Sequence, residues 1–129
     1  MSKDVASIRI AVVDDDPMIL SVFSSLMKQT VLHADFFQNS HEAFKAMASH
    51  PDRYDLLITD IVMPDGDGVD FAKKVRSVLT ELPIMFMTGF ATEEKRKEAM
   101  ALGRVEFLEK PFPFIDALEE AIKKFVAQG

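Results

Sequence analysis

The chain has 129 residues, enough for one domain and too short for two of ordinary size, and its 48% hydrophobic and 28% charged residues are typical of a globular protein. The net charge of -6 argues against direct binding to nucleic acid or to an anionic membrane. The absence of cysteine, of a long apolar run and of a signal-peptide pattern excludes disulfides, predicts no membrane insertion and favours the cytoplasm.

The first part of the chain predicts two strand–helix units. Residues 8–13 form a short β-branched run that stops at three aspartates, which indicates a buried strand. Pro17 suits the first turn of a helix, and apolar residues follow at three- and four-residue spacing. Residues 31–37 predict a second strand with one weaker face. Ser40 is expected to cap a second helix, which ends near Pro51.

The rest of the chain continues the alternation. The predicted elements are, in order, a strand over 56–58, a loop over 63–68, a helix over 69–79, a strand over 84–87, a helix from Thr92 to Gly103, a strand over 105–108 and a helix over 114–127. The charged stretch from Glu93 to Glu98 is interpreted as a solvated helix face. Its sparse apolar stripe predicts that this fourth helix is the least firmly packed.

Five strands alternating with five helices predict an α/β fold of the (βα)5 type. The middle strands are apolar on both faces, as a parallel sheet covered by helices on both sides requires. Neither a linker nor a low-complexity tract interrupts the pattern. Residues 1–129 are therefore expected to form a single domain, with a core of about residues 7–127.

Polar residues follow four of the five predicted strands. They are Asp14, Asp15 and Asp16 after the first, Asp60 after the third, Thr88 after the fourth and Lys110 after the fifth. Any one of them alone is ordinary turn or capping chemistry. Ligands of an open parallel sheet bind at the carboxyl ends of the strands, so their joint occurrence there predicts one site.

The residue types indicate phosphoryl-transfer chemistry. Crowded carboxylates repel one another, so the cluster is costly unless a cation enters it. A hard divalent ion such as Mg²⁺ prefers carboxylate and carbonyl oxygens. Carboxylates, Mg²⁺, a lysine and a hydroxyl are the parts of a phosphoryl-transfer site, and an aspartate can itself accept the phosphoryl group.

Four segments also carry a family resemblance. VVDDDP, LLITDIVMPDGDG, IMFMTG and FLEKPF resemble, in order and spacing, the signature segments of the response-regulator receiver domain of two-component signalling, of the chemotaxis-regulator type. The resemblance covers nearly the whole chain. It implies a flavodoxin-like, doubly wound fold with a five-stranded parallel sheet of order 2-1-3-4-5.

The resemblance assigns a phosphoacceptor and a metal site. Asp60 aligns with the phosphoacceptor. Asp14 and Asp15 align with the acidic pair that holds Mg²⁺, for which Mn²⁺ is a possible substitute. Asp60 and the backbone carbonyl of Val62 would complete the protein ligands. Asp16 is expected to have no direct ligand role.

The resemblance also assigns a switch. Thr88 and Lys110 align with the groups that contact the phosphoryl oxygens, and the bond between Lys110 and Pro111 aligns with a cis peptide. Phe107 aligns with the aromatic residue that turns inward on activation, together with Thr88. The surface that would change is formed by the fourth helix, the fifth strand and the fifth helix.

Two positions are expected to control the lifetime of the phosphorylated state. They are Val62, two residues after Asp60, and Phe90, two residues after Thr88. Neither side chain can orient an attacking water, and Phe90 is large enough to cover the approach. A long-lived phosphorylated state is therefore predicted.

The implied function is a phosphorelay module that takes a phosphoryl group onto Asp60. Its expected partners are a histidine kinase or a histidine phosphotransfer protein, and a downstream effector protein. It would phosphorylate and dephosphorylate only itself, so it is not expected to be an enzyme acting on an external substrate. The chain ends soon after the last predicted helix, so no output domain is expected.

Three alternatives remain open at this point. A Mg²⁺-dependent phosphatase of the haloacid-dehalogenase type also uses an aspartate after its first strand, but Met18 stands where Thr or Val is expected. A flavin-binding electron carrier shares the fold, but the three aspartates would repel its phosphate. A degenerate receiver would lack one of the acids or the lysine.

Overall fold

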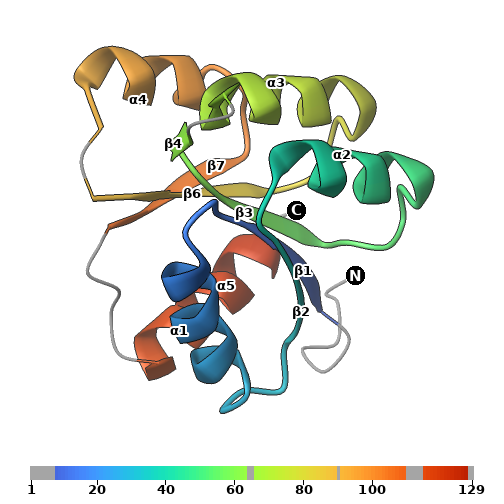
Figure 1. The fold of residues 1–129 in the computed structure, drawn as a ribbon, viewed down its shortest axis with the longest axis vertical. Helices are drawn as coiled ribbons and strands as arrows, with labels where there is room; N and C mark the ends of the chain where they lie inside the picture. Colours follow the sequence, from blue (N-terminus) through green and yellow to red (C-terminus); the bar gives the residue numbers. More distant parts are fainter. Residues whose placement is uncertain (1–7, 64–65, 90, 110–114, 128–129) are drawn as a thin grey trace.

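The computed structural model describes residues 8–63, 66–89, 91–109 and 115–127 (Figure 1). Its centre is a five-stranded parallel sheet of order β2-β1-β3-β6-β7. The strands are β1 (Arg9–Val13), β2 (His33–Phe37), β3 (Leu56–Asp60), β6 (Ile84–Thr88) and β7 (Val105–Glu109). Numbered by their order among these five, the strands follow the predicted sequence 2-1-3-4-5, so the predicted fold class is confirmed.

Five helices cover the two faces of this sheet. They are α1 (Pro17–Met27), α2 (Ser40–Ser49), α3 (Gly68–Val78), α4 (Glu93–Met100) and α5 (Ile115–Ala127). Helices α1 and α5 lie on one face, and α2, α3 and α4 lie on the other (Figure 1). None of the described helices is long and apolar enough to cross a membrane.

The strands bury side chains on both faces because successive residues of a strand point to opposite sides. Ala11 and Val13 of β1 belong to the core under α2 and α3. Ile10 and Val12 belong to the core under α1 and α5. The three central strands are therefore apolar on both faces except near their ends, and this hydrophobic burial fixes their register.

The structure differs from the sequence expectations at three local points. Asn39, not Ser40, caps α2, and its side chain accepts hydrogen bonds from two backbone amides of the first turn. Strand β2 begins at His33, two residues later than predicted. The expected loop over 63–68 contains part of a small antiparallel pair, β4 (Val62–Met63) and β5 (Gly66–Asp67).

Helix α4 has the weakest apolar attachment, as predicted. Among its residues only Ala99 is buried. Helix α3, which lies beside it, buries five residues. Interactions other than apolar burial must therefore hold α4 in place.

Tyr54 connects the segment before β3 to the edge strand β2. Its hydroxyl donates a 2.6 Å hydrogen bond to Asp35, and Arg53 lies 3.4 Å from the same carboxylate. Burial and this hydrogen bond to Asp35 raise the pKa of Tyr54 to about 12. The neutral phenol is therefore the form that the folded protein stabilises.

Tyr54 is the only tyrosine, and the chain has no tryptophan, so its ionisation can be followed directly by ultraviolet absorbance. We expect the folded protein to titrate near pH 12 and the urea-unfolded chain near pH 10. Because the folded-state pKa is raised, this contribution to stability is complete below pH 10 and is lost as the pH rises toward 12. Tyr54→Phe should lower the free energy of unfolding at neutral pH by about 1 kcal/mol. A folded-state midpoint equal to the unfolded one would contradict the assignment.

Candidate functional site

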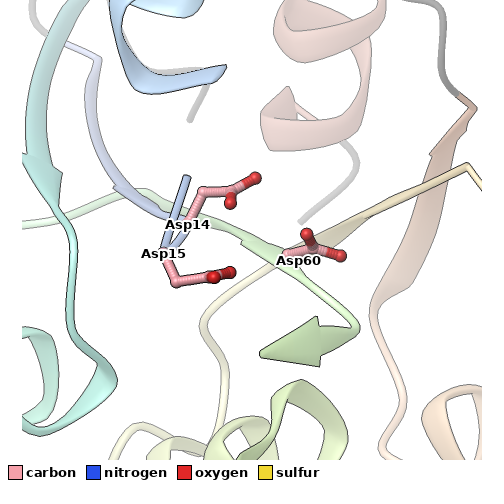
Figure 2. Close-up of side chains that lie close together, drawn as sticks. All are labelled: Asp14, Asp15 and Asp60. Carbon is pink, nitrogen blue, oxygen red and sulfur yellow. The ribbon is translucent and has the colours of Figure 1, made fainter. Parts of the chain in front are cut away.

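Three carboxylates meet where β1 and β3 end. The two strands are parallel neighbours, with Val13 opposite Thr59, so Asp14 and Asp60 follow at adjacent positions. One carboxylate oxygen from each of Asp14, Asp15 and Asp60 lies within 4.8 Å of the others (Figure 2). Asp14 is buried, whereas Asp15 and Asp60 are partly exposed. The structure thus assembles the acidic cluster that the strand ends predict.

Backbone amides hold two of these carboxylates in place. The amide of Asp16 donates a 2.9 Å hydrogen bond to Asp14 Oδ1. The amide of Val62 donates a 3.2 Å hydrogen bond to Asp60 Oδ1. Asp16 caps α1 by accepting a hydrogen bond from the amide of Met18, so its side chain has a structural task. Its lack of a ligand role stays a prediction.

The donor set suits a hard divalent cation. The cluster offers carboxylate oxygens from three residues, and Mg²⁺ binds through such oxygens while keeping several of its waters. The mutual repulsion of the carboxylates is a cost that a bound cation offsets. The residues present therefore fit Mg²⁺.

Thr88 brings a buried hydroxyl to the same edge of the sheet. It is the last residue of β6 and follows Met87, which pairs with Asp60. Thr88 is 2% exposed, and its Oγ1 has no hydrogen-bond partner among the described residues. A buried hydroxyl without a partner is costly, so this position favours a ligand that accepts its hydrogen bond.

Phe107 lies in β7 opposite Phe86 of β6. The two rings are stacked, with their centroids 6.0 Å apart. Phe107 is half-buried against the core under α2, α3 and α4.

Glu109 pairs with Thr88 and is followed in the chain by Lys110, so the fifth strand ends beside the fourth. The predicted roles of Lys110, Pro111 and Phe90 fall on residues outside those that the structure describes.

Val62 stands at the mouth of the cluster. Its side chain is 68% exposed, while its amide contacts Asp60. A cavity of about 310 Å³ lies beside it, lined by Ile61, Val62, Asp67 and Lys95. Solvent therefore reaches this side of the site.

Gly68 allows the backbone to pass close to Asp60. A Cβ atom at this position would lie 1.9 Å from the carbonyl oxygen of Asp60, so only glycine fits. The Gly68 amide donates a 2.7 Å hydrogen bond to the carbonyl of Ile61. The sequence alone indicates only that Gly68 lies in a loop, because the close approach depends on how α3 packs against the end of β3.

The role of Asp67 was also not predicted from the sequence. Its side chain caps α3 by accepting a 2.7 Å hydrogen bond from the Val69 amide, and it contacts the ammonium group of Lys95. Partial burial raises the pKa of Asp67, but the hydrogen bonds from Lys95 and Val69 outweigh it, so the pKa lies below its ordinary value. An aspartate directly before a helical apolar pattern was the available signal for the cap.

The comparisons with known proteins identify the family. The family model described as the response regulator receiver domain matches residues 10–123. The chain belongs to this family. It is 31% identical over 119 residues to the response regulator receiver protein CpdR of Brucella abortus, an alignment that covers 92% of this chain and 98% of CpdR.

Two further relatives show how the receiver domain occurs in different contexts. The chain is 29% identical over 120 residues to the transcriptional regulatory protein ZraR of Salmonella typhimurium, covering 93% of this chain but only 26% of ZraR. The structure of the chemotaxis protein CheY4 of Vibrio cholerae superposes with a TM-score of 0.80 at 27% identity, covering 92% of this chain and 98% of CheY4. The chain thus spans nearly all of some relatives and about a quarter of others.

The receiver family places the chain in two-component signalling, and receiver domains bind Mg²⁺ at an acidic pocket such as the cluster found here. The family match supports the receiver interpretation and gives no support to the phosphatase alternative.

The close approach at Gly68 can be tested by substitution. Gly68→Ala should lower the free energy of unfolding by about 3 kcal/mol, because the added methyl overlaps the Asp60 backbone. It should also shift the amide NMR resonances of residues 60–62. Gly103→Ala is the control: Gly103 has a φ of 74° but open space around it, so this variant should lose stability without disturbing the site. Unchanged resonances at residues 60–62 in Gly68→Ala would count against the constraint.

Proposed function

We propose that the chain is the phosphoacceptor module of a two-component relay, and that Asp60 receives the phosphoryl group from a phosphohistidine of a partner protein. A carboxylate oxygen of Asp60 forms the new P–O bond. The P–N bond breaks, and its electron pair stays on the imidazole nitrogen of the donor. The observation that carries the proposal is the meeting of the Asp14, Asp15 and Asp60 carboxylates at one sheet edge.

Asp60 is the best placed of the three for this role. It ends β3, the middle strand of the sheet, between the acidic pair that follows β1 and the buried hydroxyl of Thr88 on β6. It is partly exposed, so a donor can reach it, whereas Asp14 is buried. The Val62 amide fixes one of its oxygens.

The same cluster is our proposed Mg²⁺ site. Asp14, Asp15 and Asp60 would hold the ion through their carboxylates, and Val62 through its backbone carbonyl. A bound divalent ion supplies positive charge that offsets the negative charge of the transferring phosphoryl group. Asp14 and Asp15 have the further task of keeping this charge next to Asp60.

We also propose that Thr88, Lys110 and Phe107 read the phosphorylated state. Thr88 would donate its hydroxyl hydrogen to a phosphoryl oxygen, and Lys110 would contact another. The lack of a partner for the Thr88 hydroxyl within the described chain supports its hydrogen bond to the phosphoryl group, and Phe107 lies on β7, the strand that pairs with the strand of Thr88. The change would reach partners through α4, β7 and α5.

The proposed function implies which partners the chain has and where it acts. The partners are a histidine kinase or a histidine phosphotransfer protein, and an effector protein that binds the switched surface. The chain acts as one receiver domain in the cytoplasm and turns over no external substrate. The net charge of -6 supports a protein partner over nucleic acid.

The assignment of Asp60 predicts one site of modification. Incubation with acetyl phosphate and Mg²⁺ should add one phosphoryl group to the intact mass of the protein, and excess EDTA should suppress the addition. Asp60→Asn should abolish it. Asp16→Asn is the matched control, because asparagine preserves the helix cap, and it should be phosphorylated normally. A full mass shift in Asp60→Asn would rule out the assignment.

The lifetime of the phosphorylated state is expected to depend on Val62 and Phe90. Val62→Asn and Phe90→Glu introduce side chains that can hydrogen-bond an attacking water. Together they should speed the decay of Asp60 phosphate by roughly tenfold, which corresponds to ~1.4 kcal/mol of barrier. Val31→Asn, which changes another exposed valine outside the site, should leave the decay unchanged. The decay is followed by intact mass after the phosphodonor is removed; an unaltered rate in the double variant would refute this role.

A further inference from the structure

Helix α4 is held to the domain mainly by charged side chains. Its sequence is EEKRKEAM, and among its residues only Ala99 is buried. Helices that pack through an apolar stripe cannot shift without exposing that stripe to water. Helix α4 has almost no such stripe, so its position depends on its polar contacts.

The end of α4 is anchored to α3 through Arg76. The guanidinium group of Arg76 donates hydrogen bonds to the carbonyls of Leu102, at 3.2 Å, and Gly103, at 2.7 Å, just after α4. It also bonds the carbonyls of Leu79 and Leu82, which follow α3. These four bonds come from a partly buried group, so this end of α4 is the firmer one.

Lys95 attaches the beginning of α4 to the loop that follows Asp60. Its ammonium group contacts Asp67 and lies 3.0 Å from Glu98 of the same helix. Asp67 caps α3 and pairs with Val62 across the β4–β5 ladder. Lys95 therefore links α4 to the segment that shapes the mouth of the acidic cluster.

Arg96, the next residue, attaches α4 to β7. Its Nη2 lies 2.8 Å from Glu109, and its guanidinium carbon lies 5.0 Å from the centre of the Phe107 ring. A cation over an aromatic face is attracted by the ring. Arg96 thus contacts the Phe107 ring from α4, while Phe86 stacks against the ring from β6.

We propose that Lys95 and Arg96 form a clamp that holds the first half of α4 in the position seen here and thereby opposes the switch to the phosphorylated state. The inference rests on the proposed function and deepens its regulation. Neither residue is proposed to touch the phosphoryl group, so both are positioning residues. A movement of α4 relative to β7 and to β4–β5 would break their contacts, while the Arg76 bonds keep the other end fixed.

The clamp makes a prediction that simple electrostatics does not. Removing two positive charges near an anion site should by itself weaken anion binding. Releasing a clamp should instead strengthen it, because less free energy is then needed to populate the binding-competent state. The sign of the change therefore separates the two effects.

The experiment compares Lys95→Gln, Arg96→Gln and the double variant with the double control Lys45→Gln/Lys97→Gln. Both control residues are exposed, and neither forms an ion pair with any residue that the structure describes. The two doubles remove the same charge. Without ligand, hydrogen exchange of the α4 amides is measured together with urea unfolding. With Mg²⁺, the apparent affinity for beryllofluoride, a phosphoryl mimic, is measured by NMR.

The clamp predicts faster α4 exchange in the Lys95/Arg96 double variant and roughly threefold to tenfold tighter beryllofluoride binding. This range is expected for losing the two ion pairs that join α4 to other elements, Lys95–Asp67 and Arg96–Glu109. Each single variant should show part of both effects, and raising the salt concentration should speed α4 exchange more in the native chain than in the double variant. Exchange equal to that of the control, or unchanged or weaker beryllofluoride binding, would overturn the clamp. Failure of the native chain to bind beryllofluoride would overturn the proposed function instead, while the exchange measurement would still decide on the clamp.

Discussion

The parallel register between β1 and β3 is the constraint on which the site depends. Backbone hydrogen bonds place Val13 opposite Thr59, so the residues that follow bring Asp14 and Asp60 together although their charges repel. Apolar burial enforces this register. Ile10 and Val12 of β1 are fully buried, as are their partners on β3, Leu56 and Ile58. Burial of each such side chain stabilises the fold by about 1.5–3 kcal/mol, which offsets the repulsion between the carboxylates at this edge of the sheet.

The helices also favour negative charge at that edge of the sheet. Among the described residues, four side chains cap the first turn of a helix: Asp16, Asn39, Asp67 and Thr92. Because α1, α2 and α4 directly follow strands of the parallel sheet, and α3 follows the short β4–β5 pair after β3, their N-termini gather at the carboxyl end of the sheet, where helix dipoles are positive. The acidic cluster therefore lies in a region whose backbone favours negative charge.

The sequence was sufficient to predict the architecture because strand length, apolar character and the α/β alternation are local signals. It also predicted that Asp14, Asp15 and Asp60 lie together, since the carboxyl ends of neighbouring parallel strands must meet. Contacts that depend on how helices pack could not be predicted. The contact of Lys95 with Asp67 joins residues on different elements, and the passage of Gly68 beside Asp60 depends on the angle at which α3 leaves the sheet.

The sequence alone indicates that the charged residues of α4 form a solvated helix face. In the fold, some of them also attach the helix to neighbouring elements. An apolar helix of this length would lose about 1.5–3 kcal/mol for each large side chain exposed by a shift. An exposed ion pair such as that of Arg96 and Glu109 is worth only about 0.2–1 kcal/mol, and water replaces it readily. A helix attached in this way can be displaced by a single new charge-assisted contact at the site, worth ~1.5–3 kcal/mol. Under the proposed function, the weak packing of α4 is therefore the property that would let phosphorylation of Asp60 alter the surface formed by α4, β7 and α5.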